Sequence, residues 1–238
     1  MADTLVAVEI PRERVLANLR EVRQRMTAAA ARSGRPAAAV RLVAVTKTVL
    51  PEVIRALREA GQRDIGESRP QQLRDRAAAL ADCDVAWHMI GHLQRNKVKY
   101  VVPAAAMIHS VDSPALAEEI SKRAQAAGSR AACLIEVNVS GEASKSGVAP
   151  ADAPALASAV AALPAFDLAG LMTMARIADD PQDVRPVFAA LRELRDRINR
   201  EANLPRPLTE LSMGMTQDYE VAIEEGATIV RIGTALFR

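Results

Sequence analysis

Lys47 is the residue of this sequence whose position most clearly suggests chemistry, because it closes an apolar run at residues 42–47 (LVAVTK). Packing gives no reason for a strand of aliphatic side chains to end in an ammonium group. Two distant segments, residues 211–215 and 230–234, supply a hydroxyl, glycines and a guanidinium, which are groups suited to hold a phosphate. An amine facing a phosphate site favours a cofactor that carries both an aldehyde and a phosphate, and pyridoxal 5'-phosphate (PLP) fits.

Each of these residues also has an ordinary structural interpretation. The lysine could extend its head group into solvent from the strand end. Ser212 and Gly214 fit a turn, and Arg231 could form an ion pair with Glu210. Because all of them fall at strand ends of one predicted sheet, we favour the functional interpretation.

The elements that must position these residues alternate regularly along the chain. Strands are predicted at 41–47, 63–67, 86–91, 107–112, 132–139, 167–174, 209–215 and 228–234. Amphipathic helices are predicted at 51–60, 70–80, 114–127, 151–163, 181–202 and 217–225. Eight strands followed by helices indicate an α/β fold, a single (β/α)8 TIM barrel that spans residues 1–238 as one domain. Ligands of such barrels bind at the carboxyl ends of the strands, with phosphate often beside strands seven and eight.

A doubly wound sheet is the alternative fold, but it usually has fewer strands and a glycine fingerprint after the first one. Here the first strand runs into Thr-Lys-Thr, without a GxGxxG motif. The sequence ends at Arg238, just after the eighth strand, and a long helical pattern at 11–32 precedes the first strand. We expect this extra N-terminal helix to fill the gap in the helical ring that an eighth helix would otherwise occupy.

The composition excludes several classes of protein. The 31 basic and 29 acidic residues nearly cancel, and no basic tract is interleaved with aromatics, so nucleic-acid binding is not expected. No apolar stretch is long enough to span a membrane. Cys83 and Cys133 lie far apart, and no signal peptide is visible near Asp3 and Glu9, which favours a cytoplasmic protein without disulfides.

The order of motifs along the chain resembles the pyridoxal phosphate homeostasis protein family, also called YggS/PROSC. The fold of that family is similar to the barrel domain of alanine racemase. The matching segments are residues 43–47, 87–97, 109–113, 137–140, 145–148, 170–172, 211–215 and 230–234. They cover almost the whole chain after Arg41, and together they are far more specific than any one of them.

The resemblance implies that Lys47 binds PLP as a Schiff base and that Arg231 faces the pyridine nitrogen. The phosphate would be held by Ser212 and by the backbone around Met213, Gly233 and Thr234. A guanidinium against the ring nitrogen disfavours protonation of that nitrogen, so the ring is a poorer electron sink than one paired with aspartate. Carbanion chemistry at a bound amino acid would be restrained.

Three weaker signals add little to this interpretation. Relatives usually read Gly-Glu-Asn-Tyr where this chain has Ser68 and Arg69 after Gly-Glu, so the roles of that asparagine and tyrosine are not carried over. His88 and His92 are four apart but lack an HExxH motif and a third ligand, which favours a structural role. Lys145 and its neighbours could attract an anion or form a solvated loop.

Two functions from different classes fit the resemblance. The first is a non-catalytic carrier that buffers PLP and delivers it to acceptor apo-enzymes, and the second is a PLP-dependent amino-acid racemase. Racemisation needs proton donors and acceptors on both faces of the substrate, and in the racemase a tyrosine from a partner's additional domain serves the face opposite the lysine. The only tyrosines here are Tyr100 and Tyr219, and we expect Tyr219 at a surface position. The carrier, as a monomer, is therefore the favoured prediction.

Overall fold

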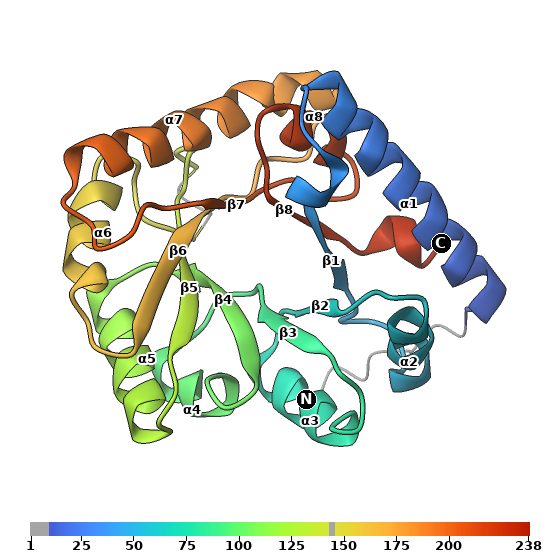
Figure 1. Ribbon diagram of the computed structural model, residues 1–238, viewed down its shortest axis with the longest axis horizontal. Coiled ribbons are helices and arrows are strands. Elements are labelled where there is room, and N and C mark those ends of the chain that lie inside the picture. Colours follow the sequence, from blue (N-terminus) through green and yellow to red (C-terminus); the bar gives the residue numbers. More distant parts are fainter. Residues whose placement is uncertain (1–9, 143–145) are drawn as a thin grey trace.

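Eight parallel strands close into a barrel in the computed structural model, which describes residues 10–142 and 146–238. The strands pair in sequence order, and β1 also pairs with β8 to close the sheet (Figure 1). Their bounds are β1 Arg41–Val45, β2 Asp64–Glu67, β3 Ala86–Met89, β4 Ala105–Val111, β5 Ala131–Glu136, β6 Phe166–Met172, β7 Glu210–Ser212 and β8 Ile229–Ile232. The predicted (β/α)8 barrel is confirmed.

The helices form a ring outside the strands (Figure 1). Their bounds are α1 Arg12–Arg32, α2 Pro51–Glu59, α3 Pro70–Ala79, α4 Val98–Val101, α5 Pro114–Ala126, α6 Ala153–Ala161, α7 Arg185–Glu201 and α8 Tyr219–Glu224. Helices α2, α3 and α5 begin with proline, which has no N–H to leave unpaired in a first turn. The sequence did not predict the short α4, and the predicted helix at 181–202 begins as a separate 3₁₀ turn, Pro181–Val184.

Most strands end earlier than the sequence predicted, for reasons of local hydrogen bonding. After β1, the Val49 N–H donates to Thr46 O, so residues 46–49 form a turn and Lys47 lies beyond the strand. After β7, the Met215 N–H donates to the Asp218 carboxylate at 2.6 Å instead of to a neighbouring strand. Lys47, Gly233 and Thr234 therefore lie in turns at the mouth of the barrel, whereas Ser212 and Arg231 remain within β7 and β8.

Helix α1 completes the helical ring, as predicted, between α2 and α8 (Figure 1). Arg32 of α1 pairs with Glu220 and Glu224 of α8 at 3.0 and 2.6 Å. The Asn18 amide of α1 donates to the carbonyls of Leu236 and Arg238, which follow β8. These contacts hold the segment after β8 against the helix that precedes β1.

Two apolar cores stabilise the barrel. The larger one, which we call the outer core, lies between the strands and the helices. In it Leu19, Ile54, Ile120 and Phe188 are fully or almost fully buried. The smaller one fills the inside of the barrel and consists of Val43, Met107, Leu134, Met172 and Ile229. Apolar burial of this kind is the main favourable contribution to folding. Within the described ranges, no helix has the length and apolarity needed to cross a membrane.

Candidate functional site

The carboxyl ends of β7, β8 and β1 form one continuous sector of the barrel mouth, because these strands are neighbours in the closed sheet. Ser212 ends β7, and Gly233 and Thr234 follow β8, where a short 3₁₀ turn begins at Thr234. A Cβ built on Gly233 would lie 3.3 Å from Val45 Cβ, so the end of β8 packs directly against β1. The structure thus brings the turn that carries Lys47 and the predicted phosphate segment together.

Lys47 lies in this sector as an exposed residue in the turn after β1. Two side chains of α3 hold the turn. The Arg76 guanidinium donates to Thr46 O and Val49 O, both at 2.6 Å, and the Gln72 amide donates to Lys47 O at 3.1 Å. We call Gln72 and Arg76 the α3 clamp. It fixes the backbone on both sides of Lys47 and leaves the lysine head group accessible.

Glu67, the last residue of β2, anchors the clamp from the outer side of the sheet, beneath α3. Its carboxylate is fully buried, accepts a hydrogen bond from Thr46 Oγ1 at 2.9 Å and pairs with Arg76. Burial raises the pKa of Glu67, while the charge of Arg76 and the hydrogen bond from Thr46 oppose that rise. The sequence reasoning missed Glu67 and Arg76. A carboxylate closing a buried strand was the signal that could have found the first of them.

Replacing Arg76 by Gln is expected to lower the free energy of unfolding by about 2 kcal/mol, because it removes charge-assisted hydrogen bonds from three oxygens. It leaves the Glu67 carboxylate buried without its cation. In the lysine turn, the carbonyl oxygens of Thr46 and Val49 lose the hydrogen bonds that Arg76 donates to them. Urea denaturation measures the loss.

A double variant separates the ion pair from the hold on the turn. Glu67→Gln combined with Arg76→Gln removes the unpaired buried charge, so it is expected to be more stable than Arg76→Gln alone. If the single and the double variant unfold at the same urea concentration, the pair with Glu67 contributes nothing and this account of the clamp is wrong.

Arg231 and Ser212 are joined to each other inside the barrel. Arg231 Nη1 donates to Ser212 Oγ at 2.5 Å, and Nη2 donates to Thr173 O at 2.9 Å. The alternative ion pair with Glu210 is wrong, because the Glu210 carboxylate accepts from Thr228 and lies 3.6 Å from Arg41. Both Arg231 and Ser212 are buried, so the serine hydroxyl points into the barrel and bonds to other protein groups.

Burial lowers the pKa of Arg231 to about 10, against the opposing charges of Glu136 and Asp218. That value leaves the guanidinium positively charged at neutral pH. The cation is therefore held in an environment with little water, where it would interact strongly with an electron-rich ligand atom. Its fixed position and charge are properties that the predicted ring-nitrogen contact needs.

Met213 and Gly214 shape the turn that follows β7. The Met213 side chain is buried in the outer core, and its N–H donates to Ile229 O at 3.1 Å. This N–H is thus occupied, and Met213 supports the turn rather than offering a donor. Gly214 has a φ of +92°, and a Cβ there would lie 2.5 Å from Ala222 Cβ, so glycine is required by both backbone and packing.

Glu136, at the end of β5, is a second buried carboxyl group, and unlike Glu67 it faces the inside of the barrel. Burial, with the nearby Asp112 carboxylate, raises its pKa to about 7 against the opposing charge of Arg231. Because the folded pKa lies above the reference value of 4.5, the folded protein binds this proton more tightly than the unfolded chain. Stability is therefore lost as the pH rises from 4.5 to 7, and the loss is complete above that range.

Replacing Glu136 by Gln is expected to raise the free energy of unfolding by about 3 kcal/mol at pH 8, and the gain should shrink toward zero near pH 4. Urea denaturation across this pH range checks the slope. Glu118→Gln on the exposed face of α5 is the matched control and should show no such dependence. A gain that stays constant with pH would contradict the assignment to Glu136.

Other residues singled out from the sequence lie elsewhere. His88 is buried and His92 is exposed, and within residues 10–142 and 146–238 no group of three or more His, Cys, Asp or Glu side chains could hold a metal. Lys145 lies outside the described residues. Tyr219 is only 2% exposed, so its predicted surface position is wrong: α8 turns the ring onto the outer core.

Comparisons with known proteins agree with this arrangement. Residues 12–238 match the family described as "Alanine racemase, N-terminal domain". A pyridoxal phosphate homeostasis protein of Aquifex aeolicus is 48% identical over 219 residues, which are 92% of this chain and 95% of that protein.

Two solved structures are also similar. An unknown protein from Bifidobacterium adolescentis is 40% identical with a TM-score of 0.90, over 98% of this chain and 100% of that one. PipY of Synechococcus elongatus with PLP bound is 34% identical with a TM-score of 0.81, over 94% and 100%. The chain therefore belongs to the pyridoxal phosphate homeostasis protein family, within the alanine racemase N-terminal-domain group.

Proposed function

We propose that this chain binds PLP through a covalent Schiff base on Lys47 and acts in PLP homeostasis as a non-catalytic carrier. The observation that carries the proposal is the position of Lys47. Its amine is exposed in a clamped turn, and β8 packs against the strand that precedes this turn. The related PipY structure with PLP bound supports the choice of cofactor.

The residues present fit the chemistry of PLP. Lys47 offers an amine for the aldehyde, and the segment at Gly233 and Thr234 offers N–H groups and a hydroxyl for the phosphate. Arg231 offers a guanidinium, which can donate to the pyridine nitrogen but is a poor source of a proton for it. When bound, PLP would supply an electrophilic aldehyde on an electron-withdrawing ring.

The two tyrosines favour a carrier over a racemase. The Tyr219 ring is buried in the outer core on α8. The Tyr100 ring lies beneath the cations of Arg74 and Lys99, 4.8 and 5.1 Å from them, on the side of α3 and α4. Both rings are engaged in these packing contacts, which supports the carrier over a racemase that would need a second proton donor.

Delivery to acceptor apo-enzymes is consistent with the exposure of Lys47, because an exposed linkage can be reached by a second amine. We propose that the carrier is a monomer. Its described cysteines, Cys83 and Cys133, are free thiols, which fits the cytoplasm. Native mass spectrometry would report the oligomeric state and a bound PLP adduct in one measurement.

The test of the proposed function is borohydride reduction of the PLP-loaded protein followed by peptide mapping. The label is expected on Lys47. The loaded protein is then incubated with single-enantiomer amino acids, and no racemisation is expected. Label confined to other lysines would refute the binding site, and racemisation at a substantial rate would refute the carrier.

A further inference from the structure

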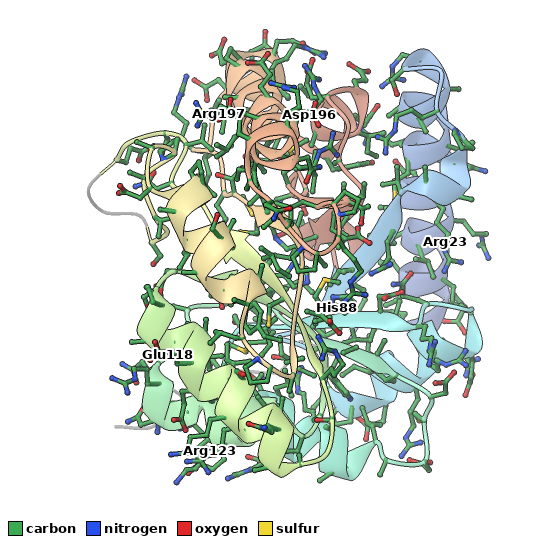
Figure 2. All side chains as sticks on the ribbon, turned by 60° about the vertical axis from the view of Figure 1, so that its left-hand side comes forward. Arg23, His88, Glu118, Arg123, Asp196 and Arg197 are labelled. Carbon is green, nitrogen blue, oxygen red and sulfur yellow. The ribbon has the colours of Figure 1, made fainter. Side chains whose placement is uncertain are left out.

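A continuous series of side-chain hydrogen bonds crosses the inside of the barrel from β2 to β8. Asp64 Oδ1 lies 2.9 Å from His88 Nε2, and His88 Nδ1 lies 2.9 Å from His109 Nε2. His109 Nδ1 lies 2.9 Å from Ser212 Oγ, which accepts the hydrogen bond from Arg231. We call these five side chains the interior chain. Figure 2 shows His88 deep inside the barrel.

The two ends of the interior chain fix the direction of every hydrogen bond in it. Arg231 can only donate, and an ionised Asp64 can only accept. Ser212 accepts from Arg231, and the acceptor that the described residues offer for its own proton is His109 Nδ1. His109 then donates from Nε2 to His88, and His88 donates from Nε2 to Asp64. Both imidazole rings are thus neutral and carry their proton on Nε2.

The opposite arrangement would leave a buried proton without an acceptor. If His109 carried a proton on Nδ1, Ser212 Oγ would receive two donors and its own proton would need a third partner. The part of the chain that the structure describes gives Ser212 Oγ no other partner than His109 and Arg231. Burial, together with the cationic side chains of Arg231 and Arg41, also holds the pKa of His109 well below its usual range.

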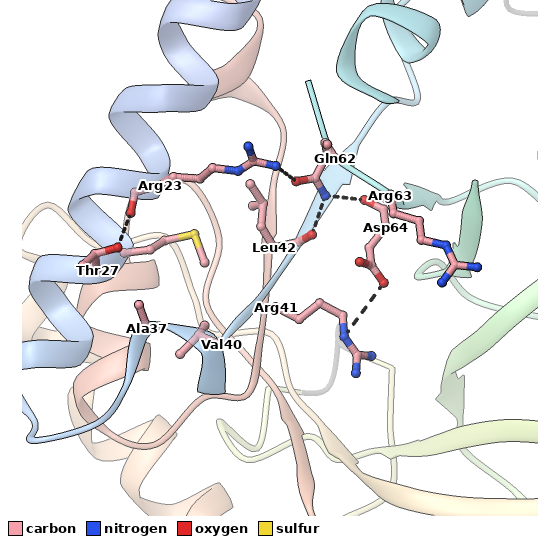
Figure 3. Close-up of a pocket in the computed structure, with 11 residues that line it drawn as sticks. Arg23, Thr27, Ala37, Val40, Arg41, Leu42, Gln62, Arg63 and Asp64 are labelled. Carbon is pink, nitrogen blue, oxygen red and sulfur yellow. Dashed lines mark hydrogen bonds and ion pairs between the residues drawn. The ribbon is translucent and has the colours of Figure 1, made fainter. Parts of the chain in front are cut away.

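The Asp64 end of the interior chain opens toward the opposite face of the barrel from Lys47. Asp64 and Arg41 line a cavity of about 360 Å³ between α1 and the amino ends of β1 and β2 (Figure 3). The Asp64 side chain is 26% exposed and lies 3.9 Å from Arg41 Nε. Glu210 faces the same arginine at 3.6 Å. At the other end, the charges of Glu136 and Asp218 act on the guanidinium.

We propose that Asp64 is a remote positioning residue for the cofactor site, and that it orients the Arg231 guanidinium through His88, His109 and Ser212. The aspartate fixes the tautomers of the two rings, and these direct the Ser212 hydroxyl proton toward His109 and a lone pair of its oxygen toward Arg231. The effect on PLP rests on the proposed function, whereas the direction of the interior chain does not.

The direction of the hydrogen bonds in the interior chain is tested by ¹⁵N NMR of the histidine rings in cofactor-free protein at pH 7. His88 and His109 are expected to be neutral with the proton on Nε2, and the exposed His92 serves as the reference ring. A charged ring, or a proton on Nδ1 of either buried ring, would overturn the proposal. This measurement needs no variant.

Substitutions of Asp64 test whether this residue sets the tautomers of His88 and His109. Asp64→Ala is expected to produce a measurable Nδ1-protonated fraction in His109 as well as in His88, because the last acceptor is gone. Asp64→Asn should restore the original signals, since its amide oxygen still accepts. Asp84→Ala is the matched control, because Asp84 pairs with Arg58 and Arg63 and is not part of the interior chain. Unchanged His109 signals in Asp64→Ala would refute the role of Asp64.

PLP titration then tests the link to the cofactor site. Asp64→Ala is expected to weaken PLP binding about threefold, and Asp84→Ala should leave it unchanged. If the NMR expectations hold and PLP affinity does not change, the interior chain exists but does not position Arg231 for the cofactor. If the wild-type protein binds no PLP, the proposed function fails while the NMR result stands.

Discussion

Replacing Lys47 by Ala is expected to remove covalent PLP capture and to weaken the apparent affinity at least about 100-fold, which corresponds to ~2.7 kcal/mol. The lysine is exposed in a turn held by Gln72 and Arg76, so its side chain contributes little to the fold. The loss should therefore appear without a change in the free energy of unfolding. Titration of the PLP absorption band and urea denaturation measure the two quantities.

Two further substitutions show whether the bond or the charge is responsible. Lys47→Arg keeps a cation at the same position but cannot form the linkage, so it should bind PLP as weakly as Lys47→Ala. Lys99→Ala removes another exposed lysine, one that lies over Tyr100, and should bind normally. Retained tight binding in Lys47→Arg would mean that electrostatic attraction, not covalent capture, holds the cofactor.

Replacing Gly170 by Ala is expected to destabilise the protein by at least about 4 kcal/mol. Gly170 pairs with Glu210 between β6 and β7. A methyl group on Gly170 would lie 2.6 Å from the Glu210 carbonyl carbon and closer still to its oxygen, which no side-chain rotation can relieve. The strands would have to separate, and Ser212, which pairs with Met172 two residues further along, would lose its position.

Urea denaturation of Gly170→Ala measures this effect, with Gly61→Ala as the control. Gly61 has a φ of +78° but open space around it, so alanine there should cost only the backbone strain, about 1 kcal/mol. Equal losses in the two variants would mean that the sheet adapts to the methyl group. In that case the close contact between β6 and β7 would not determine the register.

The fold was predictable because its signals are local. Segments with the hydrophobic period of a strand alternate with segments that have the period of a helix, and proline marks the starts of helices such as α2 and α3. These patterns predicted eight strands and the extra helix α1. Strand ends were less predictable, because hydrogen bonds such as the one from Met215 N–H to Asp218 decide where pairing stops. The position of Tyr219 was predicted wrongly, since packing of α8 against the outer core, rather than helix propensity, determines which side of that helix is buried.

The sequence by itself determined the barrel, the family and the segments in which Lys47, Arg231 and Gly233 lie, because each depends on short runs of residues and their order. Only the tertiary structure decided what these residues contact. The α3 clamp on the lysine turn and the interior chain join side chains from strands and helices that are far apart in the sequence. Barrel closure and the register between strands set those distances, and no local pattern encodes them.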